Sequence, residues 1–327
     1  MKSIPLVALF FLGPPVVIAL LDAKIKEKGK MYFGSCADPN TLSDNNVQTI
    51  LKANFGSVSP ENSMKWDAIE PSRGSFSFGN ADKLVDFAVR NGKLVRGHTL
   101  VWHAQLPSWV SNITDAATLT TVIQNHIATV VGRYKGQIYA WVDVVNEVFK
   151  EDGSFRSSVF YELLGENFIH IAFRAARDAD LGAKLYINDY RLEIPSKKID
   201  ALLSFVGRLQ SSGVPIDGIG AQGHFIVNQV GDVTPQLQRM ADTGLDVALT
   251  ELDIRIETPV TSALLTSQRS DYYTIIGACL NVTKCVGITT WGDSWVDRAM
   301  PGYGSPLLWD DNLVPKAAYD GVDTALN

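Results

Sequence analysis

The sequence predicts an α/β fold, a (β/α)8 TIM barrel in a single domain. Short β-branched or aromatic segments alternate with amphipathic helical segments, and polar or aromatic residues follow almost every predicted strand. Parallel strands need crossover connections, and eight such units in one domain close most economically into a barrel. An open doubly wound sheet is the alternative, but the Gly-rich segment 218–223 does not open a capped helix as a dinucleotide-binding turn requires.

The elements follow from periodicity and from start and stop signals. The predicted strands are Met31–Ser35, Ser57–Pro60, Leu94–His98, Ile138–Val145, Lys184–Asn188, Gly218–Gln222, Asp246–Thr250 and Gly287–Trp291. The predicted helices are Asn80–Asn91, Thr118–Tyr134, Val159–Ala179, Lys197–Ser211, Val233–Thr243 and Ser262–Cys279, with Asn80, Thr118 and Ser262 as N-caps.

The composition is that of a globular protein. The chain has 327 residues, of which 46% are hydrophobic and 20% are charged. Its formal charge of −6 argues against nucleic acid as a partner, because nucleic acid is bound through basic patches. A neutral polymer is compatible with this charge.

Residues 1–19 are predicted to be a signal peptide, cleaved after Ala19. Lys2 supplies the positive start, and an apolar run broken by Pro14 and Pro15 follows. A membrane anchor is the alternative, but the run is shorter than the roughly 20 residues a span needs. Residues 20–327 would then form one secreted, extracellular domain, without membrane contact after cleavage.

Three cysteines suit an oxidising compartment. Cys279 and Cys285 are six residues apart and predict a small disulfide loop, whereas Cys36 is expected to be a small buried hydrophobe. Asn112 and Asn281 begin glycosylation sequons.

The residues that follow the strands should converge, because every barrel strand opens with its C-terminal end onto one face. They are Glu61, Asn62, Lys65 and Trp66 after the second strand, His98, Trp102 and His103 after the third, Asn146 and Glu147 after the fourth, Asn188 to Tyr190 after the fifth, Gln222 and His224 after the sixth, Glu251 and Asp253 after the seventh, and Trp291 and Trp295 after the eighth.

The contents of this cleft suit a sugar. Trp side chains offer flat apolar platforms, and Asn, Gln, His and Lys offer hydrogen bonds to hydroxyl groups. A metal site is a weaker interpretation, because His98 and His103 lack the spacing of a zinc-binding helix. We expect no metal or cofactor, and we expect His126 and His170 to be ordinary packed or surface residues.

Glu147 and Glu251 are the predicted catalytic pair. Either carboxylate alone could belong to a structural ion pair, but together they end strands four and seven, roughly opposite each other in the barrel mouth. Glycosidic hydrolysis needs one protonated carboxyl group to donate to the leaving oxygen and one ionised carboxylate to attack or to activate water.

Five ordered motifs resemble the family 10 glycoside hydrolases, chiefly the secreted fungal endo-1,4-β-xylanases, over about residues 21–326. They are Pro60-Glu61-Asn62-Ser63-Met64-Lys65-Trp66, Arg96-Gly97-His98-Thr99-Leu100-Val101-Trp102-His103, Asp143-Val144-Val145-Asn146-Glu147, Gly220-Ala221-Gln222-Gly223-His224 and Thr250-Glu251-Leu252-Asp253.

The resemblance implies hydrolysis of xylan with retention, through a covalent intermediate. Glu147 would be the acid/base and Glu251 the nucleophile, with their carboxyl groups about 5–5.5 Å apart. Asn146 would bind the sugar 2-hydroxyl, while His224 and Asp253 would keep Glu251 ionised.

The resemblance also implies the sugar-binding residues. Glu61, Asn62, Lys65, His98, Trp102 and Gln222 would line the glycone side, Trp291 and Trp295 an aromatic wall, and Tyr190 the leaving-group side. Trp66 and His103 could instead serve packing, and Lys65 could be a solvated surface charge.

Three features depart from the family pattern. Val142 is an extra residue between Trp141 and Asp143, which a β-bulge could absorb while leaving Asn146 and Glu147 correctly aimed. Only Gly292, Asp293 and Ser294 separate Trp291 from Trp295, which is a short loop. Arg191 stands where a small polar residue is common.

We therefore expect a xylanase that acts as a monomer on β-1,4-linked polysaccharide. Two alternatives stay open: an endoglucanase or mixed-specificity β-1,4-glycanase, and a binding or inhibitor protein on a barrel that has lost catalysis.

Overall fold

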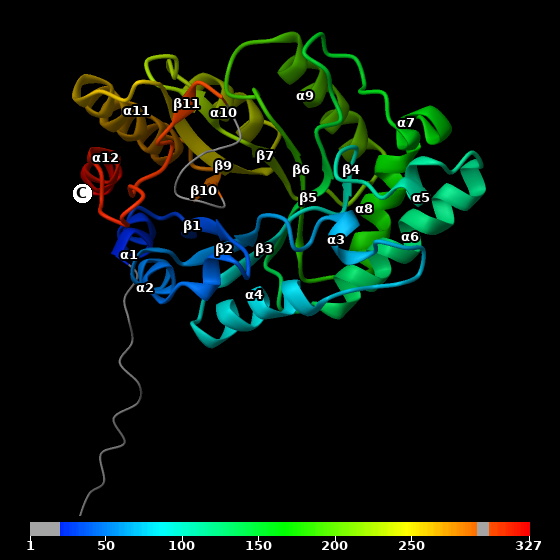
Figure 1. The fold of residues 1–327 in the computed structure, drawn as a ribbon. Helices are drawn as coiled ribbons and strands as arrows, with labels where there is room; N and C mark the ends of the chain where they lie inside the picture. Colours follow the sequence, from blue (N-terminus) through cyan, green and yellow to red (C-terminus); the bar gives the residue numbers. More distant parts are fainter. Residues whose placement is uncertain (1–19, 293–300) are drawn as a thin grey trace, which may run out of the picture.

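A computed structural model describes residues 20–292 and 301–327, in which eight parallel strands close into a barrel (Figure 1). Neighbours pair in the order β10, β1, β2, β3, β5, β6, β7, β9, and β9 pairs again with β10, which confirms the predicted fold. The barrel strands are β1 (Tyr32–Ala37), β2 (Ser57–Pro60), β3 (Leu94–Gly97), β5 (Ala140–Asn146), β6 (Lys184–Asp189), β7 (Gly218–Ala221), β9 (Asp246–Glu257) and β10 (Cys285–Thr290).

Helices lie in the connections and surround the barrel (Figure 1). They are α1 (Leu20–Glu27), the 3-10 turn η1 (Thr41–Ser43), α2 (Asn45–Asn54), α3 (Trp66–Ile69), α4 (Gly79–Arg90), α5 (Ser108–Ser111), α6 (Ala116–Arg133), α7 (Val159–Leu164), α8 (Asn167–Ala179), α9 (Lys197–Ser211), α10 (Thr234–Ala241), α11 (Ser262–Asn281) and α12 (Ala317–Leu326).

Short strands extend the barrel mouth. β4 (Val101–Trp102) pairs with β5, β8 (His224–Ile226) pairs with β9, and β11 (Tyr303–Gly304) pairs antiparallel with the end of β9. They place Trp102, which follows the third predicted strand, beside β5, and His224, which follows the sixth, beside β9.

The single helix predicted over 159–179 is wrong. Gly165, with φ of +54°, ends α7, and a new helix begins at Asn167. A left-handed backbone breaks the helix ladder, and Gly adopts it without a Cβ penalty. An apolar pattern that runs through a short loop does not reveal such a break.

The three predicted N-caps, Asn80, Thr118 and Ser262, are also wrong. The side chain of Asp115 caps α6 and that of Thr261 caps α11, each by accepting a bond from a backbone N–H of the first turn. α4 begins before Asn80, and no side chain caps it. Each predicted residue lies inside the first turn of its helix, near the true boundary.

A buried arginine occupies the interior of the barrel. The Arg96 guanidinium lies 5.1 Å from the Tyr32 ring centre and 4.8 Å from that of Tyr186. Cations are attracted to aromatic faces, so this stack helps a fully buried charge to remain inside. A Cβ on Gly218 would stand 2.2 Å from the Tyr186 ring, so only glycine leaves it room.

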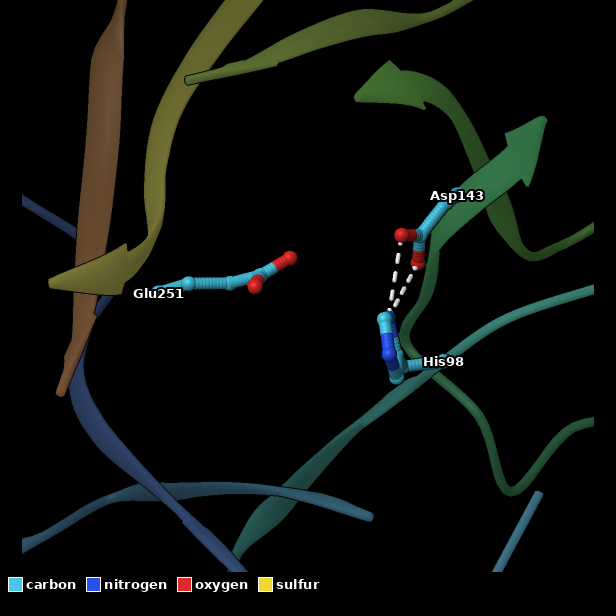
Figure 2. Close-up of side chains that lie close together, drawn as sticks. All are labelled: His98, Asp143 and Glu251. Carbon is cyan, nitrogen blue, oxygen red and sulfur yellow. Dashed lines mark hydrogen bonds and ion pairs between the residues drawn. The ribbon is translucent and has the colours of Figure 1, made fainter. Parts of the chain in front are cut away.

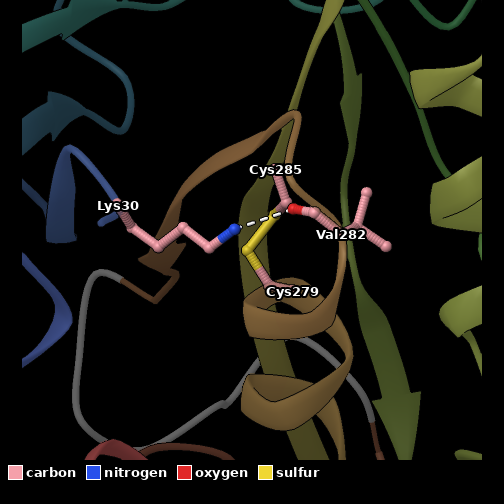
Figure 3. Close-up of a disulfide and its surroundings, with 4 residues drawn as sticks. All are labelled: Lys30, Cys279, Val282 and Cys285. Carbon is pink, nitrogen blue, oxygen red and sulfur yellow. Dashed lines mark hydrogen bonds between the residues drawn. A yellow bond between two sulfur atoms is a disulfide. The ribbon is translucent and has the colours of Figure 1, made fainter. Parts of the chain in front are cut away.

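The predicted disulfide is confirmed. Cys279 near the end of α11 is bonded to Cys285 at the start of β10 (Figure 3). Lys30 donates to the carbonyl oxygen of Val282 in the enclosed loop at 2.7 Å, which ties the loop to the N-terminal part of the chain. Cys36 is buried in β1, as predicted.

The strand that carries Glu147 is irregular. Trp141 and Val145 of β5 pair with Leu185 and Ile187 of β6, so four steps along one strand match two along the other. This is the signature of a bulge, and it lies where the extra Val142 was expected to require one.

The predicted signal peptide, residues 1–19, lies outside the described residues. Within the described part of the chain, every helix is too short or too polar to span a membrane.

Candidate active site

Glu147 and Glu251 lie at the same end of the barrel, as predicted. Glu147 directly follows β5 and Glu251 lies within β9, and their side chains join one hydrogen-bonded network. Figure 2 shows Glu251 extending from its strand toward the opposite side, where Asp143 and His98 lie.

Glu251 is buried and held by two donors. Asn188 Nδ2 lies 2.9 Å from its Oε1, and His224 Nε2 lies 3.3 Å from its Oε2. Burial raises the pKa of Glu251, but the His224 bond and the nearby His98 outweigh it, and the pKa is lowered. The carboxylate is therefore ionised at neutral pH, as a nucleophile must be.

His224 is held by a second carboxylate. Its Nδ1 bonds Asp253 Oδ2, and Asp253 also accepts from Arg255 at 2.9 Å. Burial opposes the charge on His224, but Asp253 and Glu251 raise its pKa to about 10. The imidazolium thus presents a positive N–H to Glu251.

Glu147 has a different environment. Its side chain is 16% exposed, Gln222 Nε2 donates to its Oε1 at 3.1 Å, and His103 Nδ1 lies 4.0 Å from its Oε2. The two carboxyl groups therefore differ in charge partners and exposure, which is how an acid and a nucleophile are distinguished.

Asn188 connects the site, and sequence reasoning assigned it no role. Its Nδ2 lies 3.2 Å from Asp143 Oδ2, 3.3 Å from Asn146 Oδ1 and 2.9 Å from Glu251 Oε1. Thr250 Oγ1 donates to Asn188 Oδ1 at 2.7 Å and orients the amide. Its place near the end of an apolar strand predicted that it would face the cleft, but not which groups it would bond.

His98, Asp143 and Glu251 form the one described cluster whose ligand atoms are close enough for a metal ion. His98 Nδ1 already bonds Asp143 at 2.9 Å, and the Asn188 amide donates to both carboxylates. A cation there would have to displace these donors. Burial opposes the charge on His98, but Asp143 raises its pKa overall.

The comparisons with known proteins agree with this geometry. The family model of glycosyl hydrolase family 10 matches residues 20–325. The chain belongs to this family. It is 50% identical to endo-1,4-beta-xylanase A of Phanerodontia chrysosporium over 318 residues, 95% of this chain and 78% of that protein. It is also 50% identical to endo-1,4-beta-xylanase 3 of Hypocrea jecorina strain QM6a over 308 residues, 92% of this chain and 84% of that protein.

Solved structures match along the whole barrel. The Penicillium canescens endo-1,4-beta-xylanase XylE has a TM-score of 0.89 at 37% identity, covering 94% of this chain and 97% of that one. Xylanase 10B of Thermotoga petrophila RKU-1, solved with xylobiose, has a TM-score of 0.90 at 35% identity, covering 96% and 98%.

In this family 10 chain, Lys65 is not a solvated surface charge. It is 8% exposed, its Nζ bonds Asn62 Oδ1 at 2.9 Å and Gln105 Oε1 at 2.6 Å, and it lies 5.1 Å from the Trp102 ring centre. Asp38, which sequence reasoning missed, accepts from the backbone N–H groups of Asn62 and Ser63.

Of the remaining predicted residues that the structure describes, some lie at the site and one serves packing. Trp291 packs edge-on to His98 with ring centres 5.0 Å apart, and Glu61 lies beside Cys36. Trp66 is a packing residue, stacked on the buried His126 at 3.8 Å. Trp295, Asp293 and Ser294 lie outside the described residues.

Tyr190 is held from two sides. Arg156 Nη2 donates to its hydroxyl at 2.7 Å, and Lys198 Nζ lies 3.1 Å from its ring centre while bonding the buried Asp189 at 2.8 Å. Arg191 extends to Glu151, 3.5 Å away, and its side chain is 59% exposed. Arg156 was also missed by sequence reasoning.

Proposed function

We propose that this family 10 enzyme is an endo-1,4-β-xylanase, which hydrolyses internal xylosidic bonds of xylan with retention of anomeric configuration. The observation that carries the proposal is the network joining Glu251, Asn188, Asn146, Gln222 and Glu147. It holds two unlike carboxyl groups at one end of the barrel. The relatives named above are xylanases, and one was solved with xylobiose.

In the first step, the Glu251 carboxylate attacks the anomeric carbon while protonated Glu147 gives its proton to the departing glycosidic oxygen. The bond between the carbon and that oxygen breaks, and a glycosyl ester forms on Glu251. In the second step, Glu147 removes a proton from water, which attacks the same carbon and releases Glu251. Two inversions give net retention.

The surrounding residues would bind the sugar chain. Asn146 would bond the 2-hydroxyl beside the reacting carbon, and Tyr190 would serve the leaving-group side. The glycone side would be formed by Glu61, Asn62, Lys65, His98, Trp102 and Gln222, and Trp291 would belong to an aromatic wall over the cleft. The buried bonds of Lys65 support this assignment, because they fix an ammonium group beside an aromatic platform.

Glu251→Ala tests the proposal. Turnover of xylan should fall to background in a variant that still unfolds cooperatively, because it lacks the attacking group. A near-normal rate would refute the assignment. NMR of the first-formed sugar from the wild-type enzyme should show the β-anomer, whereas the α-anomer would indicate inversion.

The alternatives have their own assays. Faster hydrolysis of carboxymethylcellulose than of xylan would favour a glucanase, and the absence of released reducing sugar would favour a binding or inhibitor protein. We expect activity without added metal or cofactor, so incubation with a chelator should leave the rate unchanged.

We further propose that the protein is secreted as a monomer after cleavage of residues 1–19, with glycans on Asn112 and Asn281. Both side chains are exposed on the surface, which supports access to them. Mass spectrometry of protein secreted by a fungal host tests the mature N-terminus and both sequons, and light scattering tests the oligomeric state.

A further inference from the structure

The backbone of the acid/base residue is itself under constraint. Glu147 has φ of +54°, a left-handed conformation that side-chain-bearing residues rarely adopt. Such a conformation persists only where neighbouring groups hold it. One support is a backbone hydrogen bond just past the end of β5, in which Glu147 N donates to the carbonyl oxygen of Asn188 at 2.9 Å.

The second support is a side chain. Arg156 Nε donates to the carbonyl oxygen of Glu147 at 3.0 Å, and Arg156 Nη2 donates to that of Phe149 at 3.3 Å. The same Nη2 donates to the Tyr190 hydroxyl at 2.7 Å. One guanidinium therefore connects the backbone of the acid/base residue with the aromatic residue assigned to the leaving-group side.

The other end of this connection is anchored. The Lys198 ammonium group packs on the Tyr190 ring. The neighbouring Asp189 accepts hydrogen bonds from Lys198 and from the backbone N–H of Phe149. Arg156 and Glu147 also line one small pocket with His103. A displacement of Tyr190 would thus be passed to the backbone that aims Glu147.

We propose that Arg156 is a positioning residue that fixes the Glu147 backbone relative to Tyr190, so that the acid/base is aimed when a sugar occupies the leaving-group side. The proposal rests on the proposed roles of Glu147 and Tyr190. Lysine cannot replace this function, because its single ammonium lacks the planar fork that reaches carbonyl and hydroxyl oxygens together.

The test uses the dependence of the rate on the leaving group. Proton donation matters for a weakly acidic leaving phenol and little for a strongly acidic one. In Arg156→Met and Arg156→Lys, kcat/KM for phenyl β-xylobioside should fall about 10- to 100-fold, the range expected for a misplaced catalytic group. For 2,4-dinitrophenyl β-xylobioside, kcat/KM should stay within about twofold of wild type.

A second measurement concerns the second step, in which water attacks the glycosyl-enzyme. Azide attacks a glycosyl-enzyme without help from a base, so it should raise kcat of Arg156→Met on the dinitrophenyl substrate and leave the wild type unaffected. Tyr190→Phe should share part of the defect, and the double variant should lose less than the sum of the two single effects.

Arg177→Met is the matched control. Arg177 also donates to backbone carbonyls, those of Leu181 and Ala183, at the start of β6 rather than at the site. It should leave the ratio of kcat/KM for the two substrates unchanged. If Arg156→Met does not fold, Arg156→Lys and Tyr190→Phe carry the same test.

Equal losses on both substrates, or no loss on either, would overturn the proposal. Failure of the proposed function looks different, because the wild-type enzyme itself would then leave both xylobiosides intact.

Discussion

Asp143 and Asn146 are three residues apart on β5, yet both bond the same amide group, that of Asn188. Side chains of a regular strand alternate between faces, so residues three apart would point in opposite directions. The irregularity between Trp141 and Val145 removes this conflict. The bulge is therefore part of the site, because it brings both residues to Asn188.

The position of Asn188 depends on a glycine in the next strand. A Cβ on Gly220 would stand 2.3 Å from Asn188 Oδ1 and 2.9 Å from a methyl carbon of Thr250. Gly220→Ala should therefore displace the amide that bonds Glu251, and kcat/KM for xylan should fall about 10- to 100-fold. Steady-state kinetics beside a thermal melt measures this.

Gly207→Ala is the control for that substitution. Gly207 lies in α9 with open space around its added Cβ, and alanine favours a helix, so activity should stay normal and stability should not fall. Wild-type kinetics in Gly220→Ala would show that the Asn188 amide does not organise the site.

Deletion of Val142 tests what the extra residue does. Asp143, Asn146 and Glu147 all follow it and keep their mutual spacing, and three steps along β5 would still face two along β6, so the strand stays irregular. Trp141 is buried against Gly97 and would be drawn forward. We expect the free energy of unfolding to fall by about 1–3 kcal/mol, the range found when a core side chain no longer fits its site. The effect on kcat should be smaller. Denaturant unfolding and xylan kinetics measure the two effects. Loss of kcat at unchanged stability would contradict this account.

The sequence predicts well that Glu147 and Glu251 meet at one end of the barrel, because both are carboxylates in or after apolar strands. It predicts the supporting residues poorly. Asn188, Asp38 and Arg156 bond other protein groups, and their partners are set by strand register and loop paths that local patterns do not encode. Asp143 is the clearest case, since strict alternation would place it opposite Asn146.

The disulfide should affect stability and leave catalysis alone. Cys285 begins β10, whereas Trp291 follows the far end of the same strand, near His98. The cysteines are six residues apart, and loop entropy for that length gives about 2 kcal/mol. The variant with Cys279→Ser and Cys285→Ser should lose about this much in chemical denaturation, with normal kcat. A large fall in kcat would mean that the loop is coupled to the site.

His224 should make stability depend on alkaline pH. Asp253 and Glu251 raise its pKa in the folded state from 6.5 to about 10 against the effect of burial. A raised pKa means that the folded state binds the proton more tightly. The stabilisation that His224 contributes to the folded state is therefore complete below pH 6.5. It declines between pH 6.5 and about pH 10 and is absent at higher pH.

His224→Gln removes this titration, so the difference in unfolding free energy between wild type and variant should shrink as pH rises through that range. Denaturant unfolding across the range measures it. His170→Gln is the control, because burial lowers the pKa of His170 and its contribution has the opposite sign. A gap between wild type and His224→Gln that stays constant or widens with pH would mean that His224 is not an imidazolium between Asp253 and Glu251.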